Sequence, residues 1–107
     1  ILQFATGRVG GILEAKKIAS MAEAHFAEIA PHLYCGPVEG AANVQVAACS
    51  PNFLIQECIG KGGEFFNEIV KEPFEWENGD MLVPDRPGIG IELDEAQLEK
   101  YRGKLRK

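Results

Sequence analysis

The chain has 107 residues, of which 46% are hydrophobic and 25% are charged, a composition typical of globular proteins and not of disordered or fibrous ones. Its formal net charge of −5 and the lack of a basic stripe argue against nucleic acid as a partner. No apolar run approaches the ~20 residues that a membrane-spanning helix needs, and no signal peptide is recognisable. We therefore expect a soluble, cytoplasmic protein with no membrane partner.

The three cysteines are Cys35, Cys49 and Cys58. They form no CxxC pair and have no histidine at zinc-finger spacing, which predicts neither a disulfide framework nor a zinc site. We expect free thiols in a reducing compartment.

The first part of the chain predicts a strand, a glycine-rich turn and a helix. Residues 1–4 form a short apolar run, and TGRVGG at 6–11 follows it. Neither phosphate-binding glycine pattern is complete, so tight turning is favoured over a phosphate site. Residues 12 to about 25 predict an amphipathic helix, and His25 at its end reads as a surface histidine. The apolar face of this helix is expected to contain Ala15, Ile18, Ala19, Ala22 and Phe26.

The alternation of strand and helix continues to Glu57. Residues 27–31 predict a second strand that ends at His32, and Pro37 begins a helix of small residues that runs to about Cys49. Residues 53–56 predict a last buried strand, and Glu57 follows at its carboxyl end. Because strands joined by a crossover helix run parallel, their carboxyl ends lie side by side, and this is where α/β proteins bind ligands.

His32 and Glu57 are therefore the candidate catalytic residues. We expect both side chains to open into one cavity, separated by on the order of 5 to 10 Å, which is one or two strand spacings. The histidine suits general acid/base work, and a carboxylate that ends a buried strand needs a pocket, a partner or a metal. Two structural alternatives remain open. In the first, His32 is a loop histidine that hydrogen-bonds the local backbone. In the second, Glu57 belongs to a structural ion pair.

The sequence changes character after Glu57. Glycines at 60, 62 and 63 predict a loop, and residues 64–70 a short helix. Residues 74–83 predict a hairpin that turns at Asn78-Gly79, with Trp76 packed away from His32. An extended stretch at 84–91 leads to Asp94, which caps a last helix at 95–101. Three strands and two helices cannot close a barrel alone, so we expect a piece of a longer chain.

Several motifs in order resemble the C-terminal part of the enolase superfamily. They are GG before the first helix, IAPH at 29–32, the helix that starts with GP at 36–37, PNFLIQE at 51–57 and PGIGIELD at 87–94. Within the superfamily the chain resembles the mandelate racemase-like subgroup, and there most closely the acid-sugar dehydratases of galactonate type.

The resemblance implies an α/β fold, the C-terminal part of a TIM-type (β/α)7β barrel. Residues 1–59 would supply its last three strands and two helices, and residues 60–107 a tail that returns to an N-terminal capping domain. It also implies a homo-oligomer and a Mg²⁺-dependent lyase acting on a sugar acid, in which proton abstraction next to the carboxylate gives an enediolate and the β-hydroxyl is lost. The metal ligands are expected in the remainder of the same polypeptide, and none is assigned in these 107 residues.

The resemblance also assigns roles at the site. His32 matches the acid/base histidine of the seventh strand, and Glu57 matches the eighth-strand carboxylate that bonds the substrate's carboxylate end. We expect Tyr34 and Cys35, in the polar turn after His32, to contact the substrate. A racemase or cycloisomerase of the same superfamily is an alternative function, and so is a barrel that binds a sugar acid without turning it over.

One departure from the family pattern concerns the histidine. Where the sixth strand usually reads Gln-Pro-Asp, this chain has Gln3-Phe4-Ala5. The absent aspartate is the residue that holds Nδ1–H of the histidine. Either another group replaces it, or His32 acts mainly as the acid that protonates the leaving hydroxyl, or activity is altered or lost.

Overall fold

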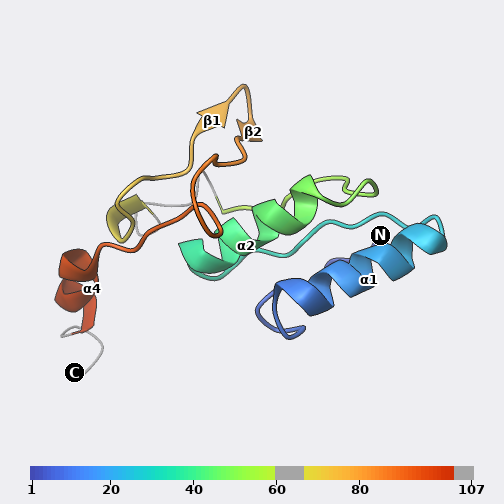
Figure 1. Cartoon of the computed structure of the whole chain (residues 1–107), viewed down its shortest axis with the longest axis horizontal. Helices are drawn as coiled ribbons and strands as arrows, with labels where there is room; N and C mark the ends of the chain where they lie inside the picture. Colours follow the sequence, from blue (N-terminus) through green and yellow to red (C-terminus); the bar gives the residue numbers. More distant parts are fainter. Residues whose placement is uncertain (60–66, 103–107) are drawn as a thin grey trace.

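The computed structural model describes residues 1–59 and 67–102. Within them lie helices α1 (Ile12–Ala24), α2 (Pro37–Ala48) and α4 (Glu95–Arg102), and the two-stranded hairpin β1 (Trp76–Glu77) and β2 (Asp80–Met81). Helices α1 and α4 lie at opposite ends of the molecule, with α2 between them (Figure 1). Among the described residues, no helix has the length and apolar character to cross a membrane.

Three extended segments lie side by side and run parallel, as predicted. We call residues 1–4 the first segment, 27–32 the middle segment and 52–57 the third segment. Leu2 pairs with Ile29, and Ile29 pairs with Phe53, so the middle segment lies between the other two. The amide of Ala30 donates to the carbonyl of Leu2, and the amide of Leu54 donates to the carbonyl of Ile29, both at 2.9 Å. Their carboxyl ends therefore meet at one edge.

Helix α1 begins after two glycines with positive φ, Gly10 and Gly11, which let the chain turn out of the first segment. Its buried residues are alanines of the predicted face: Ala15, Ala19 and Ala22. The prediction for Phe26 is wrong, because its side chain is 99% exposed. Phe26 adopts a left-handed conformation with φ of 56°, which ends the helix and directs the chain into the middle segment.

Helix α2 begins with Pro37 in its first turn, as predicted, and most of its small residues are buried. Its last turn is more open, where Ala47 is half-buried and Ala48 is exposed. Lys16 of α1 donates through Nζ to the carbonyl of Cys49 at 2.9 Å, which ties α1 to the end of α2. The core between these helices and the parallel segments consists of Phe4, Ala15, Ala19, Ala22, Ile29 and Val46.

The third segment is not buried in this chain, contrary to prediction. Phe53, Leu54 and Ile55 are 37%, 47% and 62% exposed. The middle segment pairs with one edge of it, and no described residue pairs with the other edge. The apolar run thus has the composition of a buried strand but a single neighbouring strand among residues 1–59 and 67–102.

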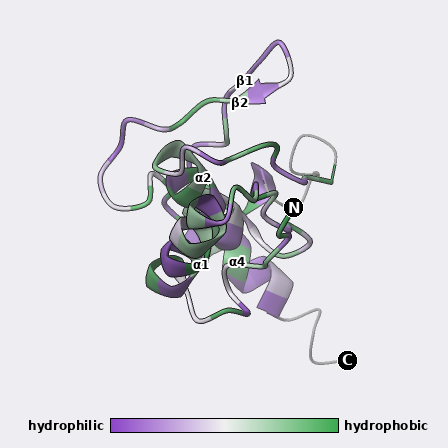
Figure 2. Cartoon of the chain, turned by 90° about the vertical axis from the view of Figure 1, so that its right-hand side faces the viewer, coloured by the Kyte–Doolittle hydropathy of each residue, from purple (hydrophilic) through white to green (hydrophobic). Residues whose placement is uncertain are grey.

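The C-terminal part folds back on itself. Val70 pairs antiparallel with Leu93, and Asp94 Oδ1 accepts hydrogen bonds from the amides of Ala96 and Gln97 at 3.0 and 3.1 Å, which confirms the predicted cap of α4. Asn78 and Gly79 have positive φ, which confirms the predicted hairpin turn. Figure 2 shows this hairpin standing out from the helices with mostly hydrophilic residues. The predicted loop at 60–63 and residues 64–66 of the predicted short helix lie outside the described residues.

Candidate functional site

The site lies at the common carboxyl edge of the parallel segments. The amide of His32 donates to the carbonyl of Phe4 at 2.9 Å, so His32 ends the middle segment while paired with the first. The amide of Glu57 donates to the carbonyl of Pro31 at 3.4 Å, which places Glu57 beside the residue before His32. Backbone pairing alone therefore brings the two predicted residues together.

The side chains of His32 and Glu57 are in direct contact. Nδ1 of His32 and Oε2 of Glu57 form a hydrogen bond. The predicted gap of 5 to 10 Å is thus wrong, because the two segments are immediate neighbours and their two side chains meet at the edge. The side chains of His32 and Glu57 are 32% and 41% exposed, so the pair stands at an open edge and not inside the core.

Two further donors reach the same carboxylate oxygen. Gln3 donates through Nε2 to Oε2 of Glu57 at 3.2 Å, and the amide of Leu33 donates to it at 3.2 Å. Oε2 therefore accepts from the first segment, from the backbone after His32 and from the imidazole. An ionised carboxylate only accepts hydrogen bonds, which puts a proton on Nδ1 of His32. In the neutral ring Nε2 then carries the lone pair.

Amide side chains support the two segments from behind. Asn43 of α2 is fully buried and donates through Nδ2 to the carbonyl of His32 at 3.0 Å. Gln56 donates through Nε2 to the carbonyls of Pro31 and Glu57 at 2.8 and 2.7 Å. The sequence interpretation missed Gln3, Asn43 and Gln56 as parts of the site. One sequence signal could have identified Asn43: it is a polar residue among the small apolar residues of α2.

The glycine-rich turn lies close to the start of α2. The amide of Gly7 donates to Oε1 of Glu39 at 2.7 Å. A phosphate would compete for this amide with a carboxylate of the chain itself, which favours the structural interpretation of the turn. The same Glu39 carboxylate hydrogen-bonds the Cys35 thiol and raises the pKa of Cys35 above its ordinary value.

Tyr34 and Cys35 lie in the exposed turn after His32. Tyr34 is 73% exposed, and Cys35 is also exposed. Their predicted contact with substrate stays a prediction. As expected, none of the three cysteines, all within the described residues, takes part in a disulfide.

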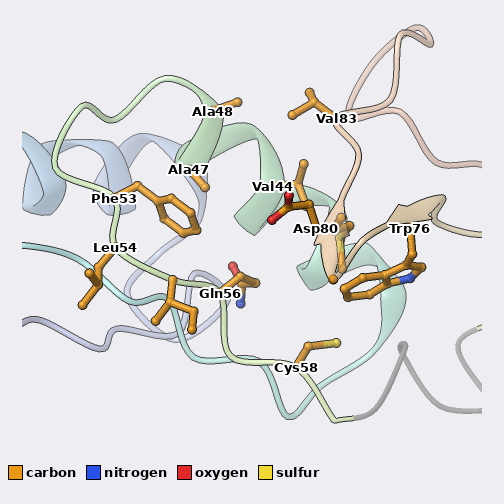
Figure 3. A pocket seen from close by; sticks show the side chains of 13 residues that line it. Val44, Ala47, Ala48, Phe53, Leu54, Gln56, Cys58, Trp76, Asp80 and Val83 are labelled. Atoms are coloured by element: carbon orange, nitrogen blue, oxygen red, sulfur yellow. The ribbon is translucent and has the colours of Figure 1, made fainter.

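A cavity of about 440 Å³ lies between α2, the third segment and the hairpin (Figure 3). Trp76 and Asp80 of the hairpin face it from one side and Phe53 and Leu54 from the other. Neither His32 nor Glu57 lines this cavity. The prediction that Trp76 lies away from the pocket of His32 agrees with this arrangement.

A divalent metal does not fit the side chains described here. Within residues 1–59 and 67–102, no group of three or more His, Cys, Asp or Glu side chains is placed to hold a metal ion. The contacts of Glu57 run to an imidazole, an amide side chain and a backbone amide, which are all hydrogen-bond donors.

Comparison with known proteins gives consistent matches. The family described as "Enolase C-terminal domain-like" matches residues 1–97. A D-galactonate dehydratase of Verminephrobacter eiseniae is 38% identical over 95% of this chain and 28% of its own length. A D-xylonate dehydratase of Haloferax volcanii is 35% identical over 88% of this chain and 23% of its own length.

Solved structures agree with the sequence relatives. A mandelate racemase/muconate lactonizing enzyme from Jannaschia sp. CCS1 is 47% identical, with a TM-score of 0.85 over 92% of this chain and 25% of that one. The chain thus spans about a quarter of the length of the proteins that it matches. It belongs to the enolase superfamily, where it corresponds to the C-terminal domain of the mandelate racemase subgroup.

Proposed function

We propose that this chain is part of a sugar-acid dehydratase, a hydro-lyase. Relatives that match most of the chain are named D-xylonate, D-gluconate and D-galactonate dehydratases. The observation that carries the proposal is the pairing of His32 with Glu57 at the open carboxyl edge of neighbouring parallel segments. Enzymes built on parallel strands place acid/base groups at this edge.

The proposed fold is that of the larger enzyme. Residues 1–59 would supply the last three strands and two helices of a (β/α)7β barrel, and residues 60–107 would return to a capping domain. Two features support this placement: the unpaired edge of the third segment among the described residues, and its exposed apolar residues Phe53, Leu54 and Ile55. A further strand beside them would complete the sheet.

The proposed reaction removes water from a 2,3-dihydroxy acid. The proton on the carbon next to the carboxylate is abstracted, the carbon–oxygen bond to the β-hydroxyl breaks, and that oxygen leaves as water after accepting a proton. The enol that remains becomes a 2-keto-3-deoxy acid. His32 is the candidate donor for the leaving hydroxyl: its Nδ1 is occupied by Glu57, so Nε2 is the ring nitrogen left for proton transfer, and the imidazolium form gives its Nε2 proton to the leaving oxygen and returns to the neutral Nδ1–H ring. Tyr34 and Cys35 in the following turn are proposed to contact the substrate.

Membership of the enolase superfamily implies a divalent metal, typically Mg²⁺. Since the described residues offer no ligand group, we propose that its ligands lie in other parts of the polypeptide.

The test is product analysis by proton NMR in D₂O. The enzyme that contains this chain is incubated with Mg²⁺ and a panel of D-galactonate, D-xylonate and D-gluconate. A 2-keto-3-deoxy acid from at least one substrate is the expected result. Deuterium at the α-carbon without loss of water would instead indicate a racemase. Thermal stabilisation by a sugar acid without any product would indicate a binding protein.

A further inference from the structure

We infer that Glu57 is the positioning residue for His32, and that it fixes the tautomer and orientation of the imidazole through Oε2. This inference rests on the proposed function, since it assigns Glu57 to the histidine and not to the substrate. It answers how His32 is oriented in a chain that has alanine at position 5, a side chain with no hydrogen-bonding atom.

Three donors converge on one oxygen of the Glu57 carboxylate. Oε2 accepts from Nδ1 of His32, from the backbone amide of Leu33 and from Nε2 of Gln3. The amide and the imidazole come from adjacent residues, so the carboxylate holds the ring relative to its own backbone. Gln3 adds a hydrogen bond to the same carboxylate from the first segment. All contacts described for the Glu57 carboxylate are to this one oxygen, which leaves no described contact to Oε1.

The exposure of the pair argues that orientation, and not stability, is its role. The side chains of His32 and Glu57 are 32% and 41% exposed, so solvent screens the attraction between them. Ion pairs in such positions contribute little to the free energy of folding. An oriented imidazole, in contrast, decides which ring nitrogen is free for proton transfer. Buried Asn43 holds the carbonyl of His32, so the backbone of the histidine is fixed independently of Glu57.

The competing assignment is that Glu57 binds the substrate directly. The two assignments differ in what Glu57→Leu does to His32. If Glu57 positions the ring, removal of its acceptor oxygens releases Nδ1–H. If Glu57 binds substrate, the tautomer of His32 in the free enzyme does not depend on it.

The first measurement is nitrogen-15 NMR of histidine-labelled enzyme without substrate, with the His32 signals assigned from their loss in His32→Asn. We expect wild-type His32 to carry its neutral-state proton on Nδ1 and Glu57→Leu to shift the population toward the Nε2–H tautomer. Glu57→Gln keeps an acceptor oxygen and should retain the Nδ1–H form. If the leucine variant does not fold, Glu57→Ala, which also removes both acceptor oxygens, takes its place with the same expected shift. Glu28→Leu, at an exposed acid at the other end of the middle segment, is the matched control. An unchanged His32 tautomer in Glu57→Leu overturns the inference.

The second measurement is a double-mutant cycle on kcat. With His32 present, Glu57→Leu should lower kcat by ~10- to 10²-fold. This is the loss typical when the group that orients a functional histidine is removed. In the His32→Asn background the same change should have an effect of less than about twofold, because residues that act as one unit are not additive. Equal losses in both backgrounds show that Glu57 acts without His32 and overturn the inference. An enzyme without dehydratase activity contradicts the proposed function, yet the tautomer measurement still tests Glu57.

Discussion

The side chains of His32 and Glu57, 25 residues apart in sequence, are joined by a hydrogen bond between Nδ1 and Oε2 at the ends of two neighbouring parallel segments. Helix α2 connects these segments, and its length returns the chain to the same edge of the sheet. The contact is therefore a consequence of topology. One crossover helix places a histidine and a carboxylate at adjacent strand ends.

Asn43 tests how far the site depends on the face of α2 behind it. Asn43→Leu removes the buried donor to the carbonyl of His32, and we expect it to destabilise the protein by about 1–3 kcal/mol because that carbonyl loses its partner. The urea midpoint of the enzyme that contains this chain gives the measurement. Asn67→Leu is the control, since Asn67 is exposed. Equal midpoints for Asn43→Leu and wild type would show that this hydrogen bond contributes nothing.

Two glycines in the stretch before α4 make a matched pair. Gly88 and Gly90 both have positive φ, of 70° and 81°. A Cβ on Gly88 would meet nothing within 4 Å, whereas one on Gly90 would clash with Cγ and Cβ of Pro84. Gly88→Ala should cost about 1–2 kcal/mol for the left-handed backbone, and Gly90→Ala about 1–3 kcal/mol more for the clash. Chemical denaturation compares them, and equal losses would contradict the close approach of Pro84.

Cys35 gives a prediction in pH. The Glu39 carboxylate, by its hydrogen bond and its charge, raises the pKa of the Cys35 thiol. A raised pKa means less thiolate at a given pH, and the thiolate is the form that reacts with alkylating agents. Glu39→Gln should therefore speed alkylation of Cys35 by iodoacetamide at a pH below the thiol pKa, and the difference should vanish well above it.

Peptide mass spectrometry reads the modification at each cysteine separately. Cys49 is the internal control, because it is exposed and its thiol bonds the carbonyl of Val46 and not Glu39. An alkylation rate of Cys35 that is the same in the wild type and in the Glu39→Gln variant would show that the carboxylate does not reach the thiol.

The exposed apolar edge predicts how the isolated chain behaves. Ile1, Leu54 and Ile55 are 74%, 47% and 62% exposed, and the third segment has an edge that no described residue pairs. Residues 1–107 expressed alone should not fold cooperatively as a monomer, because open edges and exposed apolar faces favour association. Calorimetry combined with sedimentation checks this. A sharp, reversible transition of a monomer would contradict it.

Local patterns predicted the elements well. The apolar spacing before His25, Pro37 after a glycine, and the Asn78-Gly79 pair each specify a structure through nearby residues, and the bounds of α1, α2 and the hairpin follow. The parallel order of the three segments also followed from the crossover lengths. The assignment of His32 and Glu57 to one edge needed no more than this.

The features that the sequence did not predict depend on the direction of a side chain or on which segments lie beside it. The apolar spacing of α1 includes Phe26, but the helix ends in a left-handed residue there and the ring is exposed. Phe53 begins an apolar run that reads as a buried strand, and burial requires a second neighbour that is not among the described residues. The direct bond from His32 to Glu57, and the third donor on Gln3, depend on rotamers that spacing does not encode.

The most direct test of the account is the His32→Asn variant of the enzyme that contains this chain. Asparagine keeps a hydrogen-bonding side chain of similar size at the end of the middle segment but cannot transfer a proton. We expect kcat on the sugar acid that the enzyme dehydrates to fall by ~10² to 10⁴, with the substrate Kd changed little. Normal turnover in this variant would contradict the assignment of proton transfer to His32.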